Sequence, residues 1–251
     1  GYSPIIEAGF AQAAAVEKVA KEYPDLKFAI VDMVVDLPNV QSIVFKENEG
    51  SYLAGLLAGM ASKSGKVGFV GGMDIPLIRK FGCGYAQGVK AAKPDATIFQ
   101  NMTGDTGAAW NDPVKGGEIT KGQMAQGADV IYAAAGATGL GVLQAAADGG
   151  ALSIGVDANQ NYLHPGKVLT SMLKRVDVAV YNVMKGGNEG FKPGIQALGL
   201  AEDGVGVAMD DNNKPLITPE MLAAVDKARA DIIAGTIKVH DYTTDNTCPV
   251  Q

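Results

Sequence analysis

Short apolar runs alternate with longer segments of helical periodicity along most of this chain. The apolar runs, of about four residues each, predict strands at residues 28–31, 42–45, 67–70, 97–99, 130–133 and 153–156. The segments between them carry apolar residues three and four positions apart and predict helices at residues 6–23, 50–62, 76–92, 111–126 and 138–147. Short strands that alternate with helices of this length form βαβ units with parallel strands. The pattern therefore predicts an α/β protein with a mostly parallel sheet.

The pattern becomes less regular after residue 160. It predicts strands at 168–173 and 205–209, helices at 176–184 and 219–234, a turn cluster at 186–190 and an irregular tail at 243–251. Many of the 33 glycines stand singly at the ends of apolar runs, where they are typical of turns. No short repeat or low-complexity segment interrupts the chain.

Composition and charge exclude several classes of protein. The 251 residues are 47% hydrophobic and 19% charged, which suits one large domain or two small ones with a buried core. The net charge of −6, without a basic cluster, argues against a nucleic acid or an anionic membrane as partner. No apolar stretch reaches the ~20 residues of a membrane span. Cys83 and Cys248 fit no metal-binding spacing, and a disulfide between them is left open.

The residues that follow the predicted strands are the candidate functional residues, because ligands of open parallel sheets bind at the carboxyl ends of strands. These residues are Asp32, Gly71-Gly72, Trp110, Ala135-Gly136, Asp157 and Lys174. Each also has a structural explanation: an aspartate commonly caps a turn, a single tryptophan is more often core, and a lysine is often simply solvated. Trp110 lies in a polar loop of Gly, Asn and Asp, which weakens the core explanation.

Catalysis finds little support in the sequence. No G-x-S-x-G or Walker A motif is present, and neither His164 nor His240 has a partner at metal-binding spacing. The turn at residues 136–141 inverts the dinucleotide spacing G-x-G-x-x-G. We therefore predict no catalytic residue, no metal and no cofactor. An aromatic side chain together with carboxylates favours binding of a neutral polar ring compound.

Read together, these segments resemble a known family. The resemblance is carried by FAIVD (28–32), VFKENEGSYLAGLLAG (44–59), GKVGFVGGMDIPLIRKFGCGYAQGVKAA (65–92), WNDPVKGGEI (110–119), GADVIYAAAGATGLGV (127–142), IGVDANQ (154–160) and LTSMLKRVDVAVY (169–181). They are similar to the BMP (basic membrane protein) family of bacterial substrate-binding lipoproteins of ABC importers, which includes purine-nucleoside receptors. The match runs in order to about residue 240.

The resemblance implies a two-lobed, periplasmic-binding-protein-like (type I) fold, with a doubly wound, mostly parallel sheet in each lobe and ligand in the cleft between them. We expect lobe one at residues 1–46 and 173–235, and lobe two at 47–172 and 236–251. The chain would cross between the lobes near 45–47, 171–174 and Gly235. The family pattern also has a strand–helix–strand unit before the position of Gly1, so lobe one is expected to be incomplete in this sequence.

The resemblance also implies roles for individual residues. Asp32 and Asp157 would accept hydrogen bonds from the ligand, Trp110 would stack on its ring, and Ala135 with Gly136 would let the backbone approach it. Lys174 would bond ribose oxygens or pair with Asp157. Phe81 and Arg79 are weaker candidates, because helix packing also explains them.

The function implied is that of an extracytoplasmic receptor, periplasmic or at the cell surface with a lipid anchor, that acts as a monomer. It would bind a purine nucleoside, or a free purine base, and deliver it to a membrane permease. Riboflavin or another small ligand is the next alternative. An NAD(P)-dependent enzyme is disfavoured by the glycine spacing, and a cytoplasmic regulator of the same fold by the lack of a basic DNA-binding segment.

Overall fold

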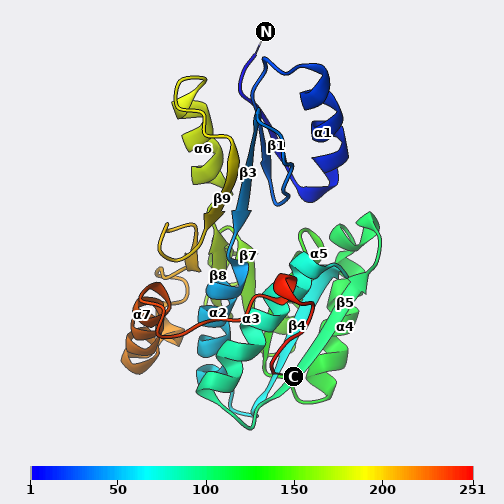
Figure 1. Ribbon diagram of the computed structural model, residues 1–251. Coiled ribbons are helices and arrows are strands. Elements are labelled where there is room, and N and C mark those ends of the chain that lie inside the picture. Colours follow the sequence, from blue (N-terminus) through cyan, green and yellow to red (C-terminus); the bar gives the residue numbers. More distant parts are fainter. Residues whose placement is uncertain (1, 251) are drawn as a thin grey trace. The chain divides into compact units, whose positions relative to one another are not determined.

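The chain forms two compact α/β units in the computed structural model, which describes residues 2–250 (Figure 1). Unit 1 contains the chain through Lys46 together with Arg175–Val205, and unit 2 contains Glu47–Lys174 together with the chain from Gly206 onward. Parallel sheets in both units confirm the predicted α/β class.

Unit 1 has a four-stranded parallel sheet in the order β1-β2-β3-β9. Its core lies between this sheet and α1, where Val16, Phe28, Ile30 and Val40 are buried. The strands are β1 (Ile5–Ala8), β2 (Phe28–Val31), β3 (Val40–Phe45) and β9 (Gly194–Leu198), and the helices are α1 (Ala13–Glu22) and α6 (Val176–Gly186).

Unit 2 has a six-stranded sheet in the order β10-β8-β7-β6-β4-β5, in which β4 to β8 pair in parallel. The strands are β4 (Lys66–Met73), β5 (Thr97–Gly104), β6 (Val130–Ala134), β7 (Leu152–Asp157), β8 (Val168–Lys174) and β10 (Val205–Val207). The helices are α2 (Glu47–Ala61), α3 (Pro76–Ala92), α4 (Pro113–Ala125), α5 (Thr138–Asp148) and α7 (Pro219–Ile233).

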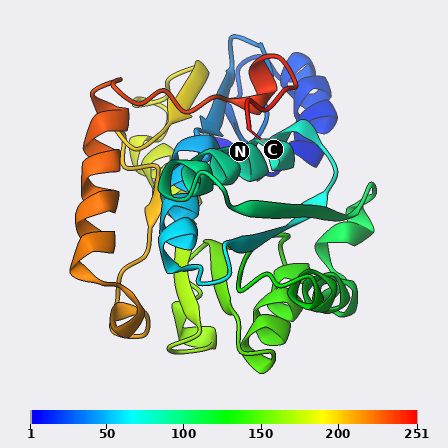
Figure 2. The ribbon, with the colours of Figure 1, turned by 90° about the horizontal axis from the view of Figure 1, so that it is seen from below.

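Helices cover both faces of the unit 2 sheet, with α2 and α3 on one face and α4 and α5 on the other (Figure 2). Three of the five helices have proline at the first turn, where its missing N–H costs nothing. The side chains of Asp112 and Thr218 cap α4 and α7 by accepting hydrogen bonds from Lys115 N and Met221 N. The strands β4, β6 and β8 are buried on both faces, as this layering requires.

Glycines allow α2 and α3 to pack with their backbones in contact. A Cβ at Gly55 would lie 2.0 Å from the carbonyl oxygen of Tyr85, and a Cβ at Gly88 would lie 2.0 Å from that of Tyr52. A Cβ at Gly84 would likewise lie 2.4 Å from a backbone oxygen of α2. We call this contact the α2/α3 glycine seam. Glycine lowers the intrinsic helix propensity of α2, but only glycine leaves room for the backbone of α3 at this contact.

The structure differs from the sequence predictions in three places. The helix expected at 6–23 is a strand at Ile5–Ala8 followed by a helix at Ala13–Glu22, because Gly9 (φ 110°) turns the chain and β1 pairs with β2. The strand β9 was not predicted. The third crossing expected near Gly235 is also wrong, because the boundary falls at Val205–Gly206 and α7 packs against α2 in unit 2. The other two boundaries fall after Lys46 and after Lys174.

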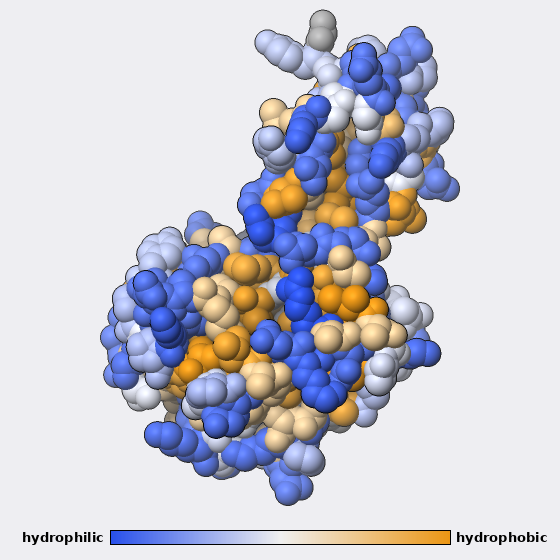
Figure 3. Space-filling model, turned by 90° about the vertical axis from the view of Figure 1, so that its left-hand side faces the viewer, coloured by the Kyte–Doolittle hydropathy of each residue, from blue (hydrophilic) through white to orange (hydrophobic). Residues whose placement is uncertain are grey.

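Cys83 and Cys248 form a disulfide, which resolves the pairing that the sequence left open. It ties the C-terminal segment to α3, 165 residues away along the chain. No helix within residues 2–250 has both the length and the apolar character needed to cross a membrane. Polar and apolar side chains are interspersed on the visible faces of both units (Figure 3).

Candidate functional site

Five of the predicted ligand-binding residues lie at the carboxyl edge of the unit 2 sheet. Lys174 and Asp157 are the last residues of β8 and β7, and Ala135 and Gly136 directly follow β6. Trp110 ends the 3-10 helix (Gly107–Trp110) that follows β5. Because β4 to β8 are parallel, their carboxyl ends meet at one edge. The structure thus places these residues on one edge of unit 2, while their roles remain predictions.

Trp110 lies against the backbone of two glycines. A Cβ at Gly72, near the end of β4, would lie 2.3 Å from Cζ3 of the indole, and a Cβ at Gly136 would lie 3.5 Å from its Cε3. The side chain is only half-buried, which differs from the core position that a single tryptophan more often takes. The glycine at 72 makes room for the indole, which no larger residue could do without displacing the ring.

Two buried threonines hold the backbone on either side of Trp110. The hydroxyls of Thr103 and Thr138 both donate to the carbonyl oxygen of Ala109, at 2.9 Å and 2.7 Å. The Thr138 hydroxyl also accepts from the N–H of Asp112 at 2.7 Å. Hydrogen bonds inside a protein are stronger than in water, so these contacts fix the loop firmly. The indole is therefore carried on a rigid support.

We expect Gly72→Ala to displace the indole of Trp110. Overpacking a site of this kind lowers the free energy of unfolding by roughly 1–3 kcal/mol. The ring should also become more exposed, so its fluorescence emission should shift to longer wavelength. The signal is specific, because the chain has one tryptophan. Gly107→Ala is the matched control, since a Cβ there meets no atom within 4 Å. An unchanged emission spectrum and stability would contradict this seating of the indole.

Both predicted aspartates adopt the left-handed backbone conformation, which is uncommon outside glycine but tolerated by Asp. Asp157 has φ 65° at the end of β7, where its side chain is exposed. Asp32 has φ 71° at the end of β2 in unit 1, where its N–H donates to the carbonyl oxygen of Ile43 at 2.9 Å. Asp203 and Asn246 adopt the same conformation elsewhere in the chain, so the roles of Asp32 and Asp157 stay predictions.

Lys174 belongs to a buried network of ion pairs that sequence reasoning missed. Its Nζ lies 3.1 Å from Oε1 of Glu47, the first residue of α2. The other carboxylate oxygen of Glu47 lies 3.1 Å from Nζ of Lys80, which in turn lies 3.2 Å from Oδ2 of Asp241. The side chains of Glu47, Lys80 and Lys174 are between 1% and 9% exposed. Buried charges of this kind persist only when they are paired.

Aromatic side chains border this network. Nζ of Lys174 lies 5.7 Å from the ring centroid of Phe81, which is within cation–π range and gives Phe81 a contact with a predicted site residue. Burial raises the pKa of the Tyr132 phenol. The hydrogen bond with the Ser51 hydroxyl, at 3.3 Å, lowers this pKa, whereas the carboxylates of Asp157 and Glu47 raise it further. Tyr132 therefore stays neutral at physiological pH.

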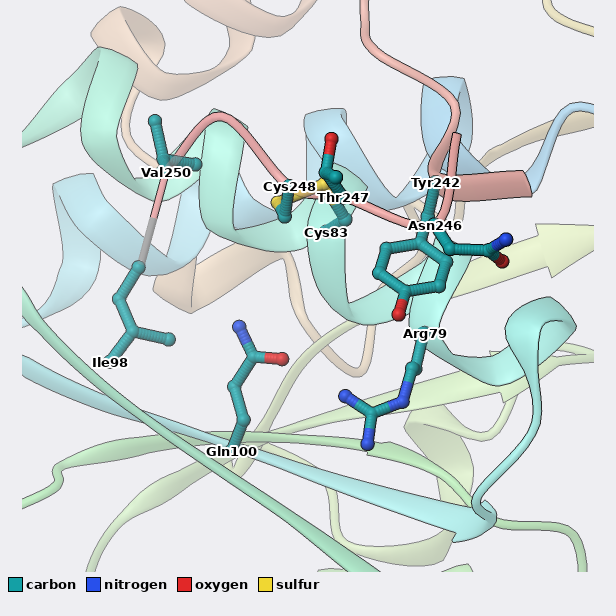
Figure 4. Close-up of a pocket in the computed structure, with 9 residues that line it drawn as sticks. All are labelled: Arg79, Cys83, Ile98, Gln100, Tyr242, Asn246, Thr247, Cys248 and Val250. Carbon is teal, nitrogen blue, oxygen red and sulfur yellow. A yellow bond between two sulfur atoms is a disulfide. The ribbon is translucent and has the colours of Figure 1, made fainter. Parts of the chain in front are cut away.

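Arg79 faces a different part of unit 2. It makes two hydrogen bonds of 2.7 Å to the carboxylate of Asp74, and these raise its pKa. It lines a cavity of about 570 Å³ beneath the C-terminal segment, together with Gln100 and Tyr242 (Figure 4). Its partner Asp74 directly follows β4, and the weaker role predicted for Arg79 in ligand binding stays a prediction.

The sequence held a weak signal for the missed residues. Glu47 is the first residue of α2, a helix that is apolar on nearly all sides, and Lys80 lies on the buried side of α3. A charged residue in such a setting needs a partner, but the partner's identity depends on tertiary packing. Among residues 2–250, no three His, Cys, Asp or Glu side chains are grouped so that they could hold a metal ion.

Comparison with known proteins gives the same family that the sequence segments resemble. A family model described as ABC transporter substrate-binding protein, PnrA-like (Bmp), matches residues 1–243. The CD4+ T-cell-stimulating antigen of Listeria monocytogenes is 38% identical over 95% of this chain and 70% of its own length. The ABC transporter nucleoside-binding protein BmpA of Lactococcus lactis is 35% identical over 95% of this chain and 71% of its own.

A solved structure supports the fold. The crystal structure of an ABC-transporter solute-binding protein from Aeropyrum pernix K1 matches with a TM-score of 0.84 and 30% identity. The match covers 94% of this chain and 77% of that one. The fold is therefore the type I solute-binding fold that the sequence predicted. Because the family model and these relatives span nearly the whole chain, the chain belongs to the PnrA-like (Bmp) family of ABC-transporter substrate-binding proteins.

Proposed function

We propose that this protein binds a purine nucleoside, or a free purine base, and delivers it to a membrane permease. The observation that carries the proposal is the half-buried indole of Trp110, seated on Gly72 at the sheet edge that ends in Asp157 and Lys174. An aromatic face suits a flat heteroaromatic ring, and a carboxylate beside an ammonium suits sugar hydroxyls. The nucleoside-binding relative named above supports the same ligand class.

Each proposed residue has a distinct task. Trp110 stacks on the base, while Asp157 accepts hydrogen bonds from the ribose hydroxyls and Lys174 donates to ribose oxygens. Gly136, in the left-handed conformation, and Ala135 let the backbone approach the ligand closely. Asp32, from unit 1, is a further acceptor. Phe81 acts through its contact with Lys174.

An extracytoplasmic location is part of this proposal. A substrate-binding component meets its ligand outside the cytoplasm and transfers it to the permease, and we propose that it does so as a monomer at the cell surface or in the periplasm. The Cys83–Cys248 disulfide supports this location, because disulfides persist in oxidising compartments. The ligand would shift the protein toward the bound conformation only because it binds that conformation more tightly than the unbound one. No chemical step is involved.

Titration of the ligand-stripped protein tests the proposal. Adenosine, guanosine, inosine, adenine and riboflavin are added in turn, and binding is followed by calorimetry and by the fluorescence of the single tryptophan. Micromolar or tighter binding of a purine nucleoside, with a change in emission and no turnover, is the expected result. Binding of riboflavin alone, whose flat ring could also stack on Trp110, would replace the purine assignment. No response to any of the five would discard it.

Asp157→Ala is expected to weaken nucleoside binding by roughly 1–3 kcal/mol, because it leaves ribose hydroxyls without an acceptor. Calorimetry with the nucleoside that binds tightest measures the change. Asp148→Ala is the control, since Asp148 is exposed at the end of α5 and bonds only locally, to Gln144. Equal affinities of Asp157→Ala and the wild-type protein would remove Asp157 from the site.

A further inference from the structure

Four charged side chains of unit 2 form a continuous line from the sheet edge to the C-terminal segment. Lys174 pairs with Glu47, Glu47 with Lys80, and Lys80 with Asp241, at N···O distances of 3.1, 3.1 and 3.2 Å. The four side chains come from β8, α2, α3 and the C-terminal segment. Only tertiary packing brings them together, and their charges, two positive and two negative, cancel.

Glu47 is the centre of the line. Its side chain is 1% exposed, and each of its carboxylate oxygens faces one ammonium group. A buried carboxylate between two ammonium groups is held in place from both sides, so it can fix where each of them points. The ammonium of Lys174 has three N–H donors, and its ion pair with Glu47 restricts where that ammonium lies.

The far end of the line is anchored by the C-terminal segment. Asn48 Nδ2 donates to the carbonyl oxygen of Val239 at 2.9 Å, and the Gln87 amide exchanges two hydrogen bonds with the backbone of His240. The disulfide between Cys83 and Cys248 secures the segment beyond Asp241 (Figure 4). The backbone on both sides of Asp241 is thus fixed to α2 and α3.

The charge of Asp241 balances that of Lys80. Burial raises the pKa of Asp241, but hydrogen bonds from Thr243 and the ammonium of Lys80 outweigh burial and hold it below its usual value. Asp241 is therefore ionised at neutral pH. Without the negative charge of Asp241, Glu47 would be the counter-ion of both buried lysines, Lys80 and Lys174.

We propose that Glu47, Lys80 and Asp241 are positioning residues for Lys174, and that the C-terminal segment thereby sets the protein's preference for ribose hydroxyls. The inference rests on the proposed function, because it assigns Lys174 to the sugar. Glu47 aims the ammonium of Lys174 at the sheet edge, Lys80 holds the second oxygen of Glu47, and Asp241 holds Lys80. None of the three positioning residues needs to contact the ligand.

The test compares two ligands that differ only in the sugar. Adenosine carries the 2′- and 3′-hydroxyls and 2′,3′-dideoxyadenosine lacks both, so the ratio of their affinities measures recognition of these hydroxyls. Calorimetric titrations give this ratio for the wild-type protein, Glu47→Gln, Asp241→Asn and the control Lys227→Met. Lys227 pairs with Asp231 on the exposed face of α7, and its side chain is 76% exposed.

We expect Glu47→Gln to lower the ratio by about tenfold and Asp241→Asn by about threefold, because a misdirected ammonium loses its bond to the sugar. Both variants should bind dideoxyadenosine as the wild-type protein does, and Lys227→Met should leave the ratio unchanged. The ratio separates positioning from general damage, since a purely structural loss weakens both ligands equally.

Three results would overturn the inference. Unchanged affinities of the variants for both ligands, with tight adenosine binding by the wild-type protein, would remove the positioning role and leave the proposed function intact. Equal weakening of both ligands would show a structural role only. Failure of the wild-type protein to bind either ligand would overturn the proposed function and the inference with it. If Glu47→Gln does not fold, Asp241→Asn decides, because the side chain of Asp241 is 27% exposed and its loss is less disruptive.

Discussion

Replacing Gly88 by alanine should lower the free energy of unfolding by about 3 kcal/mol, at the upper end of what overpacking costs. Gly88 lies in the α2/α3 glycine seam, where its added Cβ would lie 2.0 Å from the carbonyl oxygen of Tyr52 and 2.8 Å from the backbone nitrogen of Leu56. Both of these are backbone atoms of α2, so no side-chain rotation relieves the clash. The two helices must separate, and Tyr52, Leu53 and Leu57 lose part of their packing.

Urea unfolding followed by circular dichroism measures the change, with Gly122→Ala as the matched control. Gly122 lies in the exposed face of α4, and a Cβ there meets no atom within 4 Å. The same substitution should therefore stabilise the protein by about 0.5–1 kcal/mol through helix propensity alone. If the two alanine variants had equal stability, the close approach of α2 and α3 would be wrong.

Removing the disulfide should also cost about 3 kcal/mol of stability, within the range found for native disulfides. The bond closes a loop between residues 165 positions apart, so it restricts the unfolded chain strongly. The double variant Cys83→Ser, Cys248→Ser and the reduced wild-type protein should both show the loss. Urea unfolding with and without a reducing agent measures it.

The double variant has no disulfide, so its stability should not change when the reducing agent is added. It therefore controls for any other effect of that agent. A wild-type protein that unfolds at the same urea concentration before and after reduction would show that the disulfide contributes nothing. The hydrogen bonds of Asn48 and Gln87 to the backbone of the C-terminal segment would then hold it alone.

The sequence predicted the fold class because the relevant signal is local. Apolar runs such as Phe28–Val31 and Val130–Ala134 are strands buried on both faces, and proline marks the first turn of α3, α4 and α7. The strand at Ile5–Ala8 was mistaken for helix because its pairing partner lies more than 20 residues away. The strand at Gly194–Leu198 is an edge strand with mostly exposed side chains, so it leaves little apolar pattern.

The site was predictable only in part. The rule that ligands bind at strand carboxyl ends found Asp157, Lys174 and the loop of Trp110, because each follows a strand directly in the sequence. Glu47 and Lys80 lie on helices, and their pairing with Lys174 depends on how α2 and α3 pack on the sheet. For the same reason, the sequence of α7 shows an apolar face without showing which unit that face packs against.

The α2/α3 glycine seam also has a consequence for motion. Where two helices meet through side chains, changes of rotamer let them slide, but here the carbonyl of Tyr85 faces Gly55 directly and that of Tyr52 faces Gly88. A shift of one residue would drive a side chain into the opposing backbone. The two helices should therefore move as one rigid block, and their amides should be among the slowest in the protein to exchange with deuterium. Glu47, on one helix, and Lys80, on the other, would keep their separation through every conformational change that the protein makes.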